Sequence, residues 1–252
     1  MKTARLDEME QHILAQDYVT MDGLCEKFGI SMITARRDVM QLTGKGTVEK
    51  VYGGVMARKS DQLMPFSDRN TKNMEAKDRI GKRAAELVSA GDVIFLDSGT
   101  TAHHLIRHLA NKENITIVTH NLQAIVAALP FEQLNVIVLP GQLFHKTNSI
   151  TGVSTLQALN SYNFRLSFMA ASGVSADFGV TNSSPLEYEL KKLAMARGEK
   201  TVLMMDGDKF GRSAMLTYAR LSDFDAITTD KMPPEPYLEE ILSGKMELLL
   251  AK

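Results

Sequence analysis

The chain has 252 residues, a formal net charge of −1 and a single cysteine. One cysteine excludes an internal disulfide framework and a zinc site built from cysteines, which suits a reducing compartment. No apolar run approaches the ~20 residues that a membrane-spanning helix needs, and the N-terminus lacks a signal-peptide core. We therefore expect a cytoplasmic protein without a membrane partner, long enough to hold a second domain beside a small first one.

Three short helices are predicted in the first 45 residues. Apolar residues recur at helical spacing from Leu6 to Leu14, and Thr20 is a candidate cap for a second helix that ends before Gly29. The hydroxyl of Ser31 can accept from a backbone N–H two or three residues further on, so a third helix is expected to start there. Two helices, a tight turn and a third helix form the geometry with which many proteins read DNA.

The third helix is predicted to have one apolar and one polar side. Ala35, Val39 and Leu42 fall at i, i+4 and i+7, so they form a stripe that packs inward. The residues on this helix that are predicted to face DNA, together with its cap, are Ser31, Ile33, Thr34, Arg36 and Arg37. Two adjacent arginines are often only solvated, so they do not establish DNA binding by themselves.

A glycine-tipped hairpin is predicted directly after these helices. Residues 47–51 alternate like a strand, and Gly53 and Gly54 can bring bare backbone close to a phosphate or a minor groove. Lys50 and Tyr52 complete the predicted wing. Residues 31–59 carry six basic side chains and two acids, a net of +4, whereas residues 1–30 have a net of −3. The basic charge is therefore concentrated on the segment expected to face DNA.

The composition predicts a domain boundary near residue 58. Residues 58–73 are polar, contain Pro65 and show no sustained period, which favours a linker between a winged helix-turn-helix domain over 1–57 and a larger domain over 74–252. In the larger domain, helical stretches alternate with short apolar runs, which indicates a mainly parallel α/β sheet covered on both faces. The predicted strands are 93–96, 115–118, 136–139, 166–170, 201–205 and 226–229.

Polar loops follow three of the predicted strands, where α/β sheets bind their ligands. Gly99 can turn its neighbouring N–H groups toward an anion at the start of a helix, although the same loop also suits a simple helix cap. Lys209 can neutralise a phosphate, and nearby acids can accept from sugar hydroxyls. The predicted ligand-binding residues are Asp97, Ser98, Gly99, Thr100, Thr101, Thr119, His120, Asn121, Asp206 and Lys209.

Both halves of the chain resemble the DeoR family of bacterial repressors. The N-terminal half matches at Ile30-Ser31, Thr34 to Val39, Leu42, Gly46 and Tyr52 to Val55, with Tyr52 where the family has histidine. The other half matches at Asp97 to Thr101, Thr119, Asn121, Gly141, Gly152, Gly173, Gly179, Thr181, Glu187, Asp206, Lys209 to Gly211 and Thr229-Asp230.

The resemblance implies a sensor domain whose fold is shared with ribose-5-phosphate isomerase and coenzyme A transferases, with a phosphorylated sugar or related metabolite as effector. We accordingly expect a transcriptional regulator, a repressor of a carbohydrate-utilisation operon, that binds double-stranded operator DNA as a homo-oligomer.

Parts of the sequence also fit two other functions. An aldose–ketose phosphate isomerase needs a carboxylate base and an enediolate-stabilising group, for which Glu187, Asp206 and Lys209 qualify by type. A purely catalytic chain has no use for the N-terminal reading head, so no enzyme activity is predicted. His104 and His108 lie four residues apart, but such a pair without a third ligand is more often packed or solvated. No metal or other cofactor is predicted.

Overall fold

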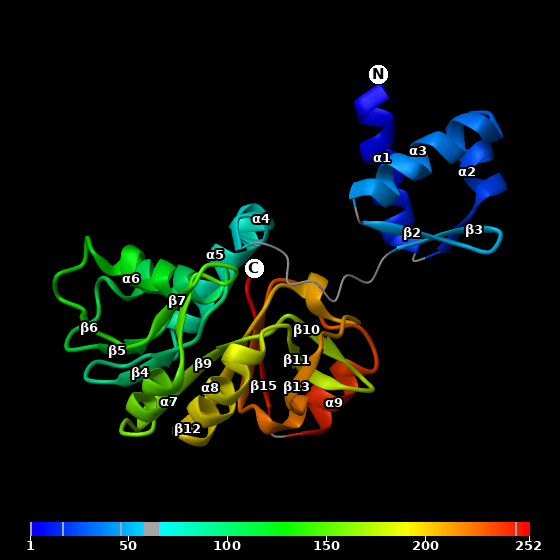
Figure 1. The fold of residues 1–252 in the computed structure, drawn as a ribbon. Helices are drawn as coiled ribbons and strands as arrows, with labels where there is room; N and C mark the ends of the chain where they lie inside the picture. The colour runs from blue at the N-terminus through cyan, green and yellow to red at the C-terminus, as the bar shows by residue number, and fades with distance from the viewer. Residues whose placement is uncertain (1, 17, 46, 58–65, 245) are drawn as a thin grey trace. The chain divides into compact units, whose positions relative to one another are not determined.

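The computed structural model describes residues 2–16, 18–45, 47–57, 66–244 and 246–252. The chain divides into two compact units, residues 1–62 and 63–252 (Figure 1). Each unit contains its own cluster of buried apolar side chains, so each has its own core. Within the described residues, every helix is too short or too polar to cross a lipid bilayer.

The first unit combines three helices with a small antiparallel sheet. Its elements are α1 (Lys2–Gln16), β1 (Tyr18–Thr20), α2 (Met21–Phe28), α3 (Met32–Lys45), β2 (Val48–Val51) and β3 (Gly54–Ala57). Thr20 caps α2 by accepting from the Gly23 N–H at 3.0 Å, and Gly29 ends it with a φ of 60°. The predicted order of three helices and a hairpin is confirmed.

The hairpin is part of a three-stranded sheet that the sequence did not reveal. Strand β1 pairs with β3, so the sheet order is β1-β3-β2. Val19 on β1, Val48 on β2 and Val55 on β3 are buried in the same core as the helices. This third strand fixes the hairpin to the body of the unit, because it pairs with β3 along its whole length.

The second unit contains a seven-stranded parallel sheet of order β15-β14-β12-β9-β4-β5-β6. The strands are β4 (Val93–Leu96), β5 (Thr116–Thr119), β6 (Asn135–Val138), β9 (Phe164–Ala170), β12 (Gly198–Met204), β14 (Ala226–Thr229) and β15 (Glu247–Leu250). The predicted mainly parallel sheet is confirmed. Strand β15 was not predicted from the sequence.

Helices cover both faces of this sheet. One core joins Ile94 and Leu96 of β4 to helices α5 (Met74–Ala85), η1 (Ala102–Leu109) and α6 (Leu122–Ala128). Phe95 of the same strand points into a second core with α7 (Val153–Leu159), α8 (Pro185–Ala196) and α9 (Tyr237–Ser243). Because successive residues of a strand face opposite sides, a fully apolar strand needs cover on both.

Shorter elements complete the second unit. They are the hairpin β7 (Gln142–Phe144) and β8 (Ser149–Thr151), the sheet of β10 (Gly173–Ser175), β11 (Gly179–Asn182) and β13 (Leu216–Ala219), and the 3₁₀ turns η2 (Gly207–Lys209) and η3 (Leu221–Asp223). Six residues of the predicted linker also form a helix, α4 (Phe66–Thr71), within the second unit. Its buried Phe66 is a single apolar anchor, too little for a recognisable period. Residues 58–65 lie outside the described residues.

Candidate DNA-reading surface and ligand site

Helix α3 presents its arginines to solvent and its apolar stripe to the core. Ala35, Val39 and Leu42 are buried, whereas Arg36 and Arg37 are exposed. Ile33 is 82% exposed, which is unusual for an isoleucine on an amphipathic helix. The predicted division of this helix into an inner and an outer side is therefore confirmed by the burial pattern.

The start of α3 is held by a local hydrogen bond. The Ser31 hydroxyl accepts from the Thr34 N–H at 3.3 Å, and the two side-chain oxygens lie 3.1 Å apart. Thr34 is thereby tied to the cap rather than directed freely outward. This contact satisfies one of the N–H groups that the first turn of a helix leaves without a partner.

Asp38 differs from the two arginines that precede it. Its side chain is fully buried, and it accepts from Arg5 of α1 at 2.7 and 3.0 Å. The carboxylate thus fixes α3 to α1 and sets the direction in which the exposed arginines point. Its position three residues after Ala35 and beside Val39 is the sequence signal for this inward placement.

The two glycines of the hairpin differ in their exposure to solvent. Tyr52 is fully exposed, Lys50 is exposed, and Gly53 adopts a φ of 80°, a left-handed conformation that favours glycine. Gly54 is buried, and a Cβ there would lie 2.6 Å from the Val19 carbonyl oxygen. The close approach that Gly54 permits is therefore to β1, a strand absent from the sequence prediction, and only Gly53 lies exposed at the tip.

In the second unit, the loop after β4 is built around the buried carboxylate of Asp97. Its oxygens accept from the N–H groups of Ser98 at 2.8 Å and Ala170 at 2.9 Å, and from the Lys191 ammonium. Burial alone would raise the pKa of Asp97, but Lys191 and His120 together hold that pKa below its usual range. The sequence placed Asp97 among the groups that accept from a ligand. The structure instead engages both of its oxygens within the protein.

The last residue of β5 and the two residues after it also support the loop that follows β4. Asn121 donates to the carbonyl oxygens of Asp97 at 3.0 Å and Gly99 at 3.2 Å, and its own oxygen caps α6. Thr119 donates to the Leu96 carbonyl at 2.6 Å, and His120 contacts the Ile150 carbonyl through Nδ1 at 3.1 Å. These three side chains are fully buried, so they position the loop and its backbone rather than line a surface.

A small cavity of about 20 Å³ lies beside this loop. Such a volume holds about one water molecule. The described residues that line it are Arg69, Ser98, Gly99, Thr147, Ala170, Ala171, Ser172, Asn182, Glu187 and Lys191. Of the residues predicted to bind a ligand, this cavity brings together only Ser98 and Gly99.

Several polar groups around the cavity come from parts of the chain that sequence analysis did not connect. Glu187 of α8 is 2% exposed and accepts from the Ser149 hydroxyl at 2.7 Å. Lys191 lies one turn further along α8, and Arg69 comes from α4. Glu187 carried a signal, because it is one of the family matches; Arg69 carried none, because it fell in the predicted linker.

Asp206 and Lys209 are not among the described residues that line the cavity, but Lys209 lies near enough to Arg69 for their charges to interact. Burial lowers the pKa of Lys209, and the neighbouring Arg69 and Arg212 lower it further against the attraction of Asp206. Burial likewise lowers the pKa of Lys77 to about 8, with Asp206 opposing this shift. Lys77 and Lys209 therefore share the influence of the Asp206 carboxylate, whereas the acid that acts on the neighbouring Arg69 is Glu187.

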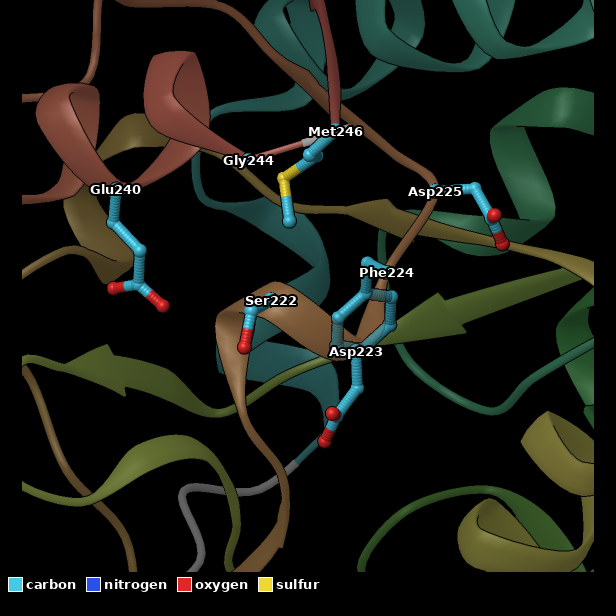
Figure 2. A pocket seen from close by; sticks show the side chains of 7 residues that line it. All are labelled: Ser222, Asp223, Phe224, Asp225, Glu240, Gly244 and Met246. Carbon is cyan, nitrogen blue, oxygen red and sulfur yellow. The ribbon is translucent and has the colours of Figure 1, made fainter.

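A larger cavity, of about 210 Å³, lies at the opposite edge of the sheet. Its lining residues include Asp225 and Met246, which directly precede β14 and β15 (Figure 2). Three of its lining residues, Asp223, Asp225 and Glu240, are acidic (Figure 2). An anionic ligand is repelled by such a wall, and ligands of parallel sheets bind at the carboxyl ends of strands. The smaller cavity is therefore the better candidate site.

The histidines of η1 take part in an ion-pair cluster. Asp78 of α5 pairs with Arg107, and its Oδ1 lies 2.8 Å from His108 Nε2. His104 is 4.0 Å from the same oxygen. Among the described residues, no group of three or more histidine, cysteine, aspartate or glutamate side chains is placed to hold a metal ion.

Comparisons with known proteins cover both units. A model described as the DeoR-like helix-turn-helix domain matches residues 5–61, and one described as the DeoR C terminal sensor domain matches residues 72–231. The chain is 37% identical over 239 residues to the HTH-type transcriptional regulator IolR of Bacillus subtilis (strain 168), covering 95% of both chains. It is 28% identical to the Glycerol-3-phosphate regulon repressor of Escherichia coli (strain K12), covering 99% of both.

A further relative is the Lactose phosphotransferase system repressor of Staphylococcus epidermidis, 28% identical, covering 95% of this chain and 99% of that one. Among solved structures, ribose 5-phosphate isomerase a from Methanocaldococcus jannaschii is 20% identical with a TM-score of 0.40, covering 55% of each chain. The two matched domains and the full-length relatives agree with the resemblance drawn from the sequence. The chain belongs to the DeoR family of transcriptional regulators.

Proposed function

We propose that this protein represses a carbohydrate-utilisation operon and that a phosphorylated sugar or related metabolite, bound by the second unit, changes its affinity for operator DNA. The observation that carries the proposal is the capped helix α3 with Arg36 and Arg37 exposed beside a glycine-tipped hairpin. The names of the full-length relatives, which include repressors of glycerol-3-phosphate and lactose systems, support the sugar-related role.

The proposed DNA contacts divide between helix and wing. Arg36 and Arg37 of α3 supply the fork-shaped donors that recognise guanine or clamp phosphates, and the protruding Ile33 suits the methyl group of thymine. Lys50, Tyr52 and Gly53 at the hairpin reach the backbone of the duplex. Ser31 and Thr34 hold the first turn of the reading helix, and Gly54 holds the wing against β1.

The DNA contacts are tested with Arg36→Ala and Arg37→Ala in the full chain. Operator fragments are first selected from genomic DNA with the parent protein. A base-edge contact is worth about 1–3 kcal/mol, so each variant is expected to bind the selected operator ten to a hundred times more weakly. Arg165→Ala, an exposed arginine of the second unit, is the matched control. Unchanged isotherms for both α3 variants would overturn the proposed reading surface.

For the effector, the proposed anion contacts are backbone N–H groups around Gly99 and the hydroxyls of Ser98, Thr100 and Thr101 at the start of η1. Lys209 adds compensating charge from the end of β12, which β9 separates from β4 in the sheet. Asp97, Thr119, His120 and Asn121 act indirectly, because their hydrogen bonds hold this loop in place. Glu187 and Asn182 on the cavity wall supply the acceptors that sugar hydroxyls need.

A thermal-shift panel identifies the effector class. Glycerol 3-phosphate, ribose 5-phosphate, glucose 6-phosphate, fructose 1-phosphate and inorganic phosphate are compared with the unphosphorylated glycerol, ribose, glucose and fructose. A ligand present at 100 times its dissociation constant stabilises the fold by about 2.7 kcal/mol. We expect stabilisation by a phosphorylated member only. Lys209→Ala should weaken that binding about tenfold or more and leave operator binding intact, with exposed Lys200→Ala as control.

We also propose that the protein acts on DNA as a homo-oligomer in the cytoplasm. One winged head buries too little surface to select a single genomic site, so paired heads on repeated half-sites are required. Sedimentation at micromolar concentration is expected to show at least a dimer. A monomer that still binds its operator would contradict this part of the proposal.

The second unit is proposed to bind its ligand without turning it over. The supporting observation is that relatives matching the full length of the chain are transcriptional regulators. Incubation of the purified protein with ribose 5-phosphate, followed by NMR, should leave the sugar unchanged. Formation of a ketose phosphate that is lost in Glu187→Gln would favour the isomerase alternative.

A further inference from the structure

A long segment of the second unit carries almost no charge. Between Glu113 and Arg165, the only acidic or basic residues are Glu132 and Lys146, although 23% of the whole chain is charged. The segment contains β5, α6, β6, the hairpin of β7 and β8, and α7. Charged side chains are normally spread over surfaces that face water, whereas they are depleted where two proteins meet. Wherever this segment reaches the surface, it has the composition of an interface.

Parts of this uncharged segment do reach the surface. Leu129 directly follows α6 and is 73% exposed, and Val138 of β6 is 45% exposed. Val126 on α6 and Val153, the first residue of α7, are exposed as well. Single exposed apolar side chains are ordinary on a protein surface, but several of them on elements that pack together form a contact surface.

These elements pack around β6, the last strand at one edge of the seven-stranded sheet (Figure 1). Val136 of β6 packs against the same core as α6 on one face, and Ile137 packs against the same core as α7 on the other. Thr155 of α7 donates to the carbonyl of Pro140, two residues after the strand, at 2.6 Å. The exposed apolar residues of α6, β6 and α7 therefore belong to one edge of the sheet.

The backbone of β6 offers hydrogen-bonding groups at this edge. The strand pairs with β5 in parallel, and the chain continues the pairing where the Leu139 N–H donates to the Thr119 carbonyl at 3.0 Å. Alternate residues of a strand direct their backbone groups to the same side, so those of Val136 and Val138 point away from β5. In the described sheet β5 is the only neighbour of β6, so these groups form its outer edge.

The opposite edge of the sheet has a different composition. Strand β15 begins with the exposed Glu247, and the exposed Lys252 follows two residues after the strand. Charged side chains on an edge strand prevent its pairing with another chain. Strand β6 reads Asn-Val-Ile-Val and has no such charge. Of the two edges, β6 is therefore the one that can accept a partner strand.

Charge complementarity favours a second copy of this chain as the partner. A twofold axis brings each residue near the axis close to its own copy, so a charged face would oppose like charges. A face without charge avoids this repulsion. Antiparallel pairing of β6 with its copy has the same symmetry. If Ile137 lies on the axis, Val136 of one copy exchanges both backbone hydrogen bonds with Val138 of the other. Pro140 lacks an N–H and ends this ladder.

We propose that β6, together with the exposed apolar residues of α6 and α7, forms the interface between two copies of this chain. The two β6 strands pair antiparallel about Ile137, so the two seven-stranded sheets join into one continuous sheet. This inference rests on the proposed homo-oligomer and identifies the surface that forms it.

The first test introduces charge into the interface of the full chain. Val138→Glu and Leu129→Glu should each raise the dissociation constant measured by sedimentation about tenfold or more, because the twofold axis places carboxylates from both copies in an apolar contact. Leu242→Glu on α9 is the matched control, since Leu242 is 69% exposed and Leu129 is 73% exposed. The control should associate like the parent. Parent-like association of both interface variants would overturn the proposal.

A mixing experiment separates loss of the interface from damage to the fold. Val138→Glu and Val138→Lys should each associate weakly alone, whereas their equimolar mixture should associate more tightly than either, because opposite charges then meet across the axis. A variant that is only destabilised is not rescued by mixing. No gain in the mixture would show that the two Val138 side chains do not approach each other, which contradicts the twofold arrangement.

A cross-link tests the pairing of the strands. At a non-hydrogen-bonded antiparallel pair the Cα atoms lie about 4.5 Å apart, within the range that a disulfide spans. Because Cys25 is the only cysteine, Ile137→Cys is made in a Cys25→Ser background. Mild oxidation should produce a disulfide-linked dimer on a non-reducing gel, whereas Leu242→Cys in the same background should stay unlinked. Absence of the linked dimer, or equal yields from both variants, would contradict pairing about Ile137.

The outcomes distinguish this surface from the proposed homo-oligomer itself. If the parent sediments as a monomer, the proposed homo-oligomer fails and the inference fails with it. If the parent is a dimer that neither glutamate substitution weakens, the homo-oligomer stands and this surface is wrong.

Discussion

The two units of the molecule use their recognisable polar residues in opposite ways. On α3, Arg36 and Arg37 point to solvent and contribute little to folding. In the loops after β4 and β5, Asp97 and Asn121 are buried and bonded to the chain itself. A helix surface displays its functional side chains, whereas a strand-end loop uses them to orient backbone N–H groups. The same sequence signal, a cluster of polar residues, therefore has two different physical meanings.

This difference predicts which substitutions alter folding and which alter binding. Replacing an exposed arginine removes a contact with a partner and leaves the core unchanged. Replacing a buried, ion-paired carboxylate leaves an uncompensated ammonium inside the protein. A residue of the strand-end loops whose replacement altered ligand binding alone would contradict this division, whereas one whose replacement unfolded the second unit would support it.

The largest effect is expected for Asp97→Asn. A neutral amide cannot balance the charge of Lys191, which is 2% exposed. Its NH₂ group, unlike the carboxylate oxygen that it replaces, cannot accept a hydrogen bond from a backbone N–H. Breaking a buried pair in this way costs about 3–5 kcal/mol of unfolding free energy. Urea denaturation followed by circular dichroism measures the change. Exposed Asp177→Asn in the turn between β10 and β11 is the control.

A different outcome would restore the interpretation made from the sequence. If Asp97→Asn unfolds like the parent but loses binding of the active sugar phosphate, the carboxylate faces the ligand and the contrast between the units disappears. If it unfolds early and binds once folded, the carboxylate is a positioning group, as its contacts with Ala170 and Lys191 indicate.

The parts of the fold that the sequence predicts best are those set by local patterns. Ser31, the stripe from Ala35 to Leu42 and the strand Val93–Leu96 follow from capping and periodicity, and the structure has the helix and the strand there. Strand β1 could not be predicted, because three residues are too few to show a period-2 pattern. Its extended conformation depends on pairing with β3. The position of Gly54 is explained only by that pairing.

The candidate ligand site was less predictable, because its walls come from distant parts of the chain. Ser98 and Gly99 are local to one loop, whereas Arg69, Asn182 and Glu187 reach it only through the tertiary fold. A single sequence records no such proximity. The polar residues of the loop can be identified from the sequence, but the sequence does not show that several of them are buried and have a structural role.

An intermediate effect is expected for Ser31→Ala in the DNA-reading unit. The substitution removes the acceptor for the Thr34 N–H, and loss of such a cap costs about 1 kcal/mol. Hydrogen exchange of the α3 amides should accelerate about fivefold, because these amides exchange by local opening. Exposed Ser154→Ala on α7 is the matched control. Exchange equal to that of the parent would show that the first turn is held by other contacts.

The smallest expected effect is the uptake of protons when the ligand binds. It distinguishes the buried Lys77 from the exposed arginines of α3. Burial lowers the pKa of Lys77 to about 8, so at pH 8 about half of the Lys77 side chains are protonated in the folded protein. A phosphate dianion bound near Arg69 raises that pKa again, so ligand binding at pH 8 should take up at most about half a proton. Affinity should then fall as the pH rises above 8.

Calorimetry at pH 8 in Tris and HEPES, which differ in ionisation enthalpy, measures this uptake. The phosphate ester is already a dianion at pH 8, since its second pKa is about 6, and so does not contribute. Proton uptake on ligand binding should vanish in Lys77→Met. Operator binding by the parent, which uses the exposed Arg36 and Arg37, should also take up no protons at Lys77. Equal uptake in the parent and Lys77→Met would show that the dianion lies too far from this cation cluster to sense it, and that the second unit recognises its ligand without these buried charges.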